Sequence, residues 1–280
     1  MDIELLRTFL ELHRTRHFAR AAERLHLTQS AVSARIRLLE ETLGQQLFTR
    51  KRNDIQLTPA GNRLLKHAET IFSAWTRARQ EASLTPDYTT SLAVGGAFDL
   101  WNILLTEWLG RVNQRLPDIA LQAEAHASDV LVRRLVDGVL DLAFLFEPPR
   151  LPGQVVRQVA VVNLVLVDTR RGRDAADALS HGYVLVNWGE SFALQHSRLY
   201  PDAPTPSLRM SHGALALSFI LRRGGAAYLP ERLVAGLLDE GRLHRVADAP
   251  PVERFAYAVY HPGGEREAVI RQALACLEPA

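Results

Sequence analysis

Four polar side chains recur on one side of a short predicted helix, Gln29 to Leu43. They are Gln29, Ser30, Ser33 and Arg37, and they lie opposite the apolar residues Val32, Ile36, Leu39 and Leu43, which are predicted to be buried. In the major groove of DNA, a glutamine can pair with adenine, serines can reach bases or phosphates, and an arginine can bind phosphate or guanine. Arg35 lies at the edge of this face, and Arg35 and Thr28 are expected to contact DNA together with these four residues. For any one side chain alone, a solvated polar helix surface would explain it equally well.

The neighbouring residues predict the support that a DNA-reading helix needs. Apolar residues recur at helical spacing in residues 4–15, and a second short helix fits Phe18 to Leu25. Thr28 is suited to cap the third helix because its hydroxyl can accept an early backbone N–H, and Gly44 is suited to end that helix. Helix, short turn and amphipathic helix together indicate a helix-turn-helix.

A basic hairpin is predicted directly after it. Two β-prone runs in residues 47–58 flank Asn53 and Asp54, which tolerate a tight turn. Arg50, Lys51 and Arg52 crowd the approach to that turn and could neutralise DNA phosphates. We therefore assign residues 1–58 to a winged helix-turn-helix DNA-binding domain.

The charge distribution agrees with this assignment. Residues 1–84 hold 14 Lys/Arg and 9 Asp/Glu, a net charge of +5, whereas the rest holds 19 and 22, a net charge of −3. A basic segment on an acidic remainder is typical of a polyanion-binding module attached to another domain. A chance fluctuation of a few charges is the alternative.

A long helix should follow at residues 59–84, with Thr58 as its cap and Pro59 in its first turn. Its apolar stripe is too long for the small preceding domain to cover, which predicts pairing with another chain. The alternative is packing on the chain's own C-terminal domain. The residues assigned to dimerisation are Leu64, Ala68, Ile71, Phe72 and Trp75.

Strand-like and helix-like segments alternate in residues 91–280, which predicts a parallel α/β domain large enough for two lobes with a cleft. Ligands of open α/β sheets bind near the carboxyl ends of strands. The residues expected to line an effector site there are Phe98, Asp99, Ser128, Trp188 and Ser211. Ordinary loop and capping roles are the alternative for each.

Other classes of protein find little support in the 280 residues. The charged fraction is 23% and the hydrophobic fraction 47%, as in globular proteins, and no apolar run is long enough to span a membrane. Known catalytic motifs are missing, and the single cysteine, Cys276, cannot form an internal disulfide. We expect no catalytic residues, no metal site, no cofactor and a cytoplasmic location. The rival hypothesis is a solute-binding or enzymatic α/β protein whose basic N-terminus serves as a scaffold or an oligomerisation arm.

The segment FARAAERLHLTQSAVSARIRLLEETLGQQLFTR, followed by LTPAG, resembles the N-terminal module of LysR-type transcriptional regulators. LVDGVLDLAF, RRGGAAYLP and YAVYHPG resemble later segments of that family, and the N-terminal motifs look most like its HdfR-type group. The resemblance implies a winged helix, a dimerising linker helix and a two-lobed effector domain like that of periplasmic binding proteins. It also implies four kinds of partner: double-stranded DNA with inverted T-N11-A sites, other copies of the chain in a homodimer or homotetramer, a small-molecule effector, and RNA polymerase. No membrane association is expected.

Three positions depart from the family pattern. Arg16 and His17 replace a Gly-Ser pair before the second helix, which removes the expected glycine end and serine cap. Ala34 stands where the family often has Arg or Gln, so base readout there must be weaker or pass to Arg35. Asp99 lies where anion-binding members often carry Ser or Thr; a carboxylate there would satisfy the N–H groups of its own helix start and repel an acid. The expected effector is therefore neutral, or there is none.

Overall fold

The computed structural model describes residues 2–51, 54–82, 88–148 and 152–277. The chain divides into two compact units, one ending near residue 86 and the other containing most of the remaining residues. Each unit has its own apolar core. None of the described helices has the length and apolar character needed to cross a membrane.

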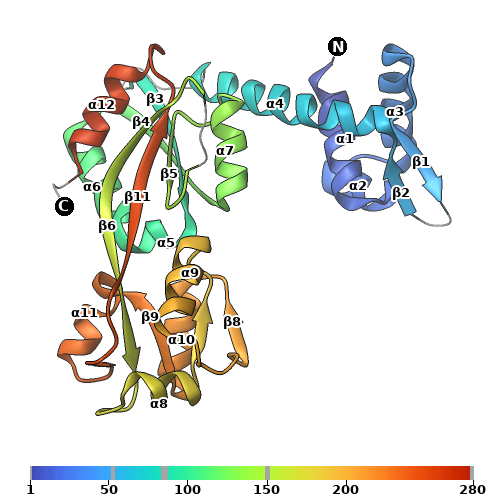
Figure 1. Cartoon of the computed structure of the whole chain (residues 1–280). Helices are drawn as coiled ribbons and strands as arrows, with labels where there is room; N and C mark the ends of the chain where they lie inside the picture. Colours follow the sequence, from blue (N-terminus) through green and yellow to red (C-terminus); the bar gives the residue numbers. More distant parts are fainter. Residues whose placement is uncertain (1, 52–53, 83–87, 149–151, 278–280) are drawn as a thin grey trace. The chain divides into compact units, whose positions relative to one another are not determined.

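The N-terminal unit contains four helices and a two-stranded hairpin in its described part (Figure 1). Their bounds are α1 (Ile3–Thr15), α2 (Phe18–Leu25), α3 (Gln29–Leu43), β1 (Phe48–Lys51), β2 (Asp54–Leu57) and α4 (Pro59–Ala82). The hairpin pairs Lys51 with Asp54, so Asp54 belongs to a strand and not to the predicted turn. The residues between, including Arg52, lie outside the described part of the chain.

The helix ends follow from local hydrogen bonds. Thr28 accepts the N–H of Ala31 at 3.2 Å, and Gly44 ends α3 with a φ of 62°, as predicted. Arg16 and His17 form the end of α1 and the cap of α2, for which a Gly-Ser pair was expected. Arg16 adopts the left-handed conformation with a φ of 52°, and the His17 ring accepts the N–H of Ala19. The turn and the cap are therefore both retained, although the residues differ from the family pattern.

The core of the N-terminal unit takes up part of two predicted faces. Val32, Ile36 and Leu39 are buried, but Leu43 is 40% exposed because it lies at the end of α3, beyond the packed helices. On α4, Ala68 is fully buried and Leu64 packs against the same core. These two residues were predicted to contact another chain, and instead they hold α4 to its own domain.

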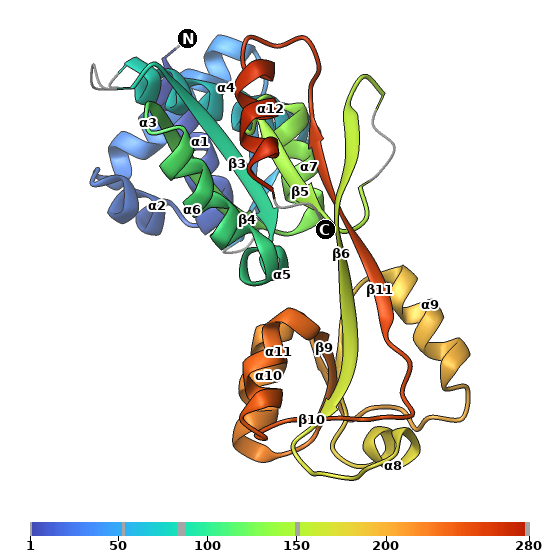
Figure 2. The ribbon, with the colours of Figure 1, turned by 90° about the vertical axis from the view of Figure 1, so that its left-hand side faces the viewer.

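The C-terminal unit contains two lobes joined by two long strands, β6 (Val155–Asp168) and β11 (Val252–Tyr260), which run side by side between the lobes (Figure 2). Lobe I contains β3 (Thr90–Ala97), α5 (Phe98–Leu100), a π-helical turn (Trp101–Leu105), α6 (Thr106–Arg115), β4 (Ile119–His126), α7 (Ser128–Val136), β5 (Leu142–Leu145) and α12 (Glu267–Ala275). Lobe II contains α8 (Ala175–Ser180), β7 (Val184–Val186), α9 (Glu190–Leu199), β8 (Leu208–Met210), α10 (Gly213–Arg223), β9 (Ala226–Pro230), α11 (Glu231–Asp239) and β10 (His244–Arg245).

The prediction of a wholly parallel sheet is wrong. The β3–β4, β3–β5 and β7–β8 pairs are parallel, but β11 is antiparallel to β5 and β6, and β6 is antiparallel to β9 and β10. The chain crosses between lobes through β6 and returns through β11, so these two strands must run in opposite directions. Alternating segments of similar hydrophobicity did not reveal that reversal.

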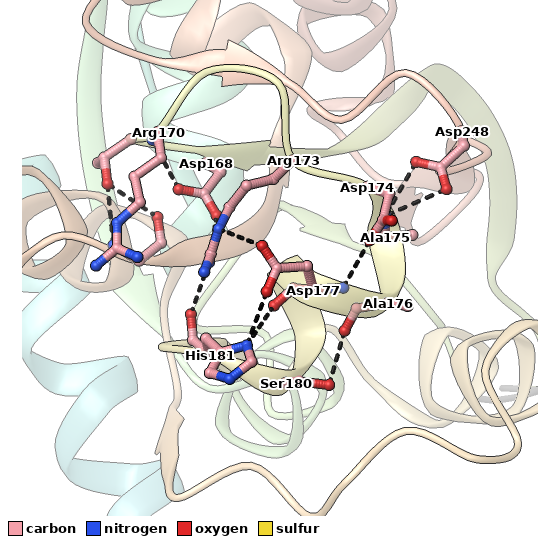
Figure 3. A network of polar contacts seen from close by, with 12 residues as sticks. Asp168, Arg170, Arg173, Asp174, Ala175, Ala176, Asp177, Ser180, His181 and Asp248 are labelled. Carbon is pink, nitrogen blue, oxygen red and sulfur yellow. Dashed lines mark hydrogen bonds and ion pairs between the residues drawn. The ribbon is translucent and has the colours of Figure 1, made fainter.

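A network of charged groups fixes the end of β6 in lobe II (Figure 3). The carboxylate of Asp168, the last residue of that strand, is almost fully buried and lies 3.2 Å from Nη1 of Arg173. Arg173 also contacts Asp177 at 2.8 Å and donates to the carbonyl oxygen of His181. The network ties β6 to both ends of α8.

Candidate DNA-binding face and effector cleft

The start of α3 presents its polar side chains to solvent. Gln29, Ser30 and Arg37 are exposed and Ser33 is half-buried, while the opposite face packs in the core. The hydroxyls of Thr28 and Ser30 lie 2.9 Å apart, so the cap and the first turn are held together. Such a face offers short polar groups from the end of a helix, which is how a recognition helix contacts base edges.

The hairpin is anchored beside this helix. The Oε1 atom of Glu40 accepts the backbone N–H groups of Leu47 at 2.7 Å and Phe48 at 3.2 Å. Ser33 and Arg37 of α3 line a groove together with Phe48 and Thr49 of β1. Recognition helix and hairpin therefore form one surface. The side chains of Arg50 and Lys51, and all of Arg52, lie outside the described residues.

Arg35 lies differently from the other predicted DNA contacts. Its Nη1 atom lies 3.3 Å from Oε2 of Glu4 and 3.4 Å from Oγ1 of Thr8, both on α1. The guanidinium is thus engaged within the domain and joins α3 to α1. Base readout by Arg35, the expected replacement for a contact at Ala34, does not fit this arrangement.

Asp99 connects the two lobes of the C-terminal unit. Its Oδ1 atom accepts the backbone N–H of Gly213, the first residue of α10, at 2.9 Å, and its Oδ2 atom lies 3.6 Å from Nδ1 of His212. The predicted role was to satisfy the start of its own helix, and the structure corrects this: α5 begins at Phe98 without a side-chain cap, and the carboxylate satisfies the start of α10 in the opposite lobe. Asp99, His212 and Gly213 are called the inter-lobe latch below.

The latch is tightly surrounded. The Phe98 ring lies 4.8 Å from the His212 ring, and a Cβ on Gly213 would lie 2.6 Å from Cη2 of Trp188, so only glycine fits there. Burial raises the pKa of Asp99, although the Gly213 N–H and the nearby His212 oppose that shift. Phe98, Asp99 and Trp188 are thereby brought together around α10.

A second polar group lies beside the start of α9. The Arg254 guanidinium on β11 is buried, lies 4.2 Å above the Phe146 ring and lies 2.9 Å from Oε1 of Glu147. Burial lowers the pKa of Arg254, opposed by Glu147 and Asp99. A Cβ on Gly189, whose φ is 96°, would approach both Arg254 and Glu147 to about 3 Å. This pair was not predicted from the sequence, although alternation in β11 places Arg254 on the buried face between Val252 and Ala256.

The remaining predicted effector residues are less closely associated. Ser211 is exposed and lines a pocket of lobe II together with Trp188. Ser128 is exposed at the start of α7, and no recorded contact in the described part of the chain joins it to the latch. No group of three or more His, Cys, Asp or Glu among the described residues is placed to hold a metal ion.

Comparison with known proteins decides the family. Residues 3–62 match the bacterial regulatory helix-turn-helix proteins of the lysR family, and residues 87–280 match the LysR substrate binding domain. The chain belongs to the LysR family of transcriptional regulators. This family consists of DNA-binding regulators with an effector domain, so the rival interpretation as an enzyme is excluded.

Relatives cover nearly the whole chain. It is 39% identical to the HTH-type transcriptional regulator HdfR of Yersinia enterocolitica and 37% identical to HdfR of Yersinia pestis, in both cases over 98% of this chain and 95% of the relative. The expected likeness to the HdfR-type group is therefore confirmed. Among solved structures, the crystal structure of CbnR, a LysR family transcriptional regulator, has a TM-score of 0.75 at 19% identity and covers 99% of this chain and 100% of CbnR. CbnR complexed with its target DNA has a TM-score of 0.74 at 20% identity, covering 99% of each chain. These two structures support the fold.

Proposed function

We propose that this regulator reads an inverted-repeat operator with the exposed start of α3 and adds phosphate contacts from the hairpin. The observation that carries the proposal is a capped helix whose first turn exposes Gln29 and Ser30 beside an anchored hairpin. A gel-shift assay against fragments with inverted T-N11-A sites tests it. We expect a discrete complex that survives competition by random DNA; equal binding to both would contradict it.

The regulator would act in the cytoplasm, where its operator and RNA polymerase are found. The distal part of α4 would join two copies, because Ile71 and Trp75 remain exposed after Leu64 and Ala68 pack in their own domain. Two copies related by a twofold axis match the two halves of an inverted repeat.

Replacing Gln29 with Ala should weaken binding to the operator by about 1–3 kcal/mol and leave binding to random DNA nearly unchanged. Base contacts carry sequence preference, whereas phosphate contacts act on every sequence. Fluorescence anisotropy on both DNAs measures the two effects. Gln45→Ala is the matched control, since Gln45 is also exposed but lies beyond the opposite end of α3. Equal losses on operator and random DNA would make Gln29 a backbone contact.

For the effector domain, we propose that the inter-lobe latch takes the place that an acid ligand would need. A helix N-terminus favours a negative group, and Asp99 already supplies one to α10. A ligand in contact with the start of α10 would then be neutral, and a simple anion would not bind at the Gly213 N–H.

Replacing Asp99 with Ser should free the Gly213 N–H and create affinity for a small anion that the native protein lacks. Calorimetric titration of both forms with sulfate and acetate measures this gain. Asp129→Ser is the matched control, because Asp129 is an exposed aspartate in the first turn of α7. Tight acetate binding by the native protein, with Asp99 in place, would contradict the proposal.

A further inference from the structure

A pocket lies within lobe II, and Trp188, which also lies against Gly213 of the latch, is part of its lining. It encloses about 720 Å³ between α9, the loop of residues 200–206 and the ends of β7 and β8. This volume is within the range of small-molecule sites, roughly 300–1,000 Å³. The rings of His196 and Tyr200 are half-buried on its wall, and the almost fully buried Trp188 and Phe192 lie behind them.

The rings are held in place by one another. The His196 ring stacks on Tyr183 at 5.5 Å with an interplanar angle of 13°, and it meets the edges of Tyr200 and Tyr228 at 5.3 and 6.0 Å. Pro201, Pro204 and Pro206 stiffen the loop on the other side. A site whose walls are already ordered loses little conformational entropy when a flat ligand enters.

The hydrogen bonds leave specific polar atoms for a ligand. The Tyr228 hydroxyl donates to the carbonyl oxygen of Pro250 at 3.0 Å, so in the 2.7 Å contact between the two tyrosines Tyr200 must be the donor. On His196, Nε2 lies 3.0 Å from the Tyr183 hydroxyl, and Nδ1 has no hydrogen-bond partner recorded among the described residues. Burial lowers the pKa of His196 and so favours the neutral ring.

Among the described residues that line the pocket, Arg209 carries a permanent positive charge. Arg209 of β8 is exposed at the pocket, and the described part of the chain shows no ion pair for its guanidinium. The described lining residues include no Asp or Glu. An arginine at the rim of an aromatic pocket can form a bidentate pair with a carboxylate or phosphate.

We propose that this lobe II pocket binds a planar aromatic ring that carries one anionic group. The ring lies against the half-buried side chains of His196 and Tyr200, and the anionic group pairs with Arg209. The site differs from the latch in both place and preference, since the latch excludes anions and the pocket attracts one.

Trp188 connects the pocket with the latch. One side of this buried ring lines the pocket, its Nε1 atom donates to the carbonyl oxygen of Tyr228, and its Cη2 atom lies against Gly213. A ligand that displaces Trp188 therefore shifts Gly213, whose backbone N–H donates to Asp99. This regulatory step rests on the proposed function of the effector domain, whereas binding in the pocket does not.

Titration of the full-length protein with indole-3-acetate and with indole, followed by calorimetry, tests the pocket directly. Both probes have the same ring, and only the first has an acid. We expect one indole-3-acetate per chain, bound at least tenfold more tightly than indole. Arg209→Gln should weaken indole-3-acetate binding about tenfold and leave indole binding unchanged. Ala193→Trp, which fills the pocket from α9, should abolish both.

Arg198→Gln is the matched control, because Arg198 is an exposed arginine on α9 that does not line the pocket. The proposal is overturned if the native protein does not bind indole-3-acetate, if Arg198→Gln and Arg209→Gln have the same effect, or if Ala193→Trp binds indole-3-acetate normally. Operator affinity measured with and without the ligand separates the two proposals: saturable binding without any change in DNA affinity supports the pocket and contradicts only its link to the latch.

Discussion

Replacing Trp75 with Glu should convert the protein to a monomer and lower its operator affinity by two or more orders of magnitude. Trp75 is 46% exposed and Ile71, one turn earlier on α4, is 39% exposed, which is unusual for large apolar side chains on one helix face. A carboxylate set against apolar groups of a second copy costs several kcal/mol. Sedimentation measures the mass, and a gel shift measures binding. A monomer contacts only one half of an inverted repeat, so binding weakens with the loss of the second half.

The matched control is Ser73→Glu, which places the same charge on the opposite side of α4. Its two-residue separation from Trp75 corresponds to about 200° around the helix. This variant should remain dimeric and bind the operator normally. A Trp75→Glu protein of native mass and native operator affinity would show that the exposed stripe is covered in some other way.

The sequence was informative wherever short-range chemistry decides the structure. The start of α3 after Thr28 and its end at Gly44 could be predicted, because a hydroxyl cap and a left-handed glycine act through local hydrogen bonds and backbone conformation. The basic hairpin and the long helix after Pro59 followed from turn chemistry and from helical spacing. The prediction that Arg16 and His17 remove the end of α1 and the cap of α2 was wrong, because these two residue types can form the same turn and cap as glycine and serine.

What the sequence could not supply depends on contacts between distant segments. Asp99 lies 114 residues before Gly213, and Arg254 lies 107 residues after Glu147, so neither pair leaves a pattern along the chain. The apolar stripe of α4 divides between its own domain at Ala68 and the exposed surface at Trp75, although helical spacing treats both residues alike. The reversal of β6 and β11 likewise depends on tertiary pairing.

Replacing Arg173 with Ala should lower the free energy of unfolding of the C-terminal unit by about 3–5 kcal/mol, as expected when one partner of a buried ion pair is removed. The Asp168 carboxylate is only 1% exposed, and without Arg173 it would keep one recorded hydrogen bond, from the N–H of Arg170 at 2.7 Å. The charge would then be buried with little compensation. Arg173 also holds Asp177 and the carbonyl oxygen of His181, so the ends of α8 would loosen as well (Figure 3).

Calorimetric melting of the full chain measures this loss, because the two units have separate cores and their transitions can be followed separately. The transition of the C-terminal unit should fall, while that of the N-terminal unit stays in place. Arg171→Ala is the matched control, since Arg171 is exposed two residues away. Adding Asp168→Asn to Arg173→Ala should recover part of the stability by removing the unpaired charge. A double variant as unstable as Arg173→Ala alone would locate the cost in the α8 contacts of Arg173, not in the buried charge of Asp168.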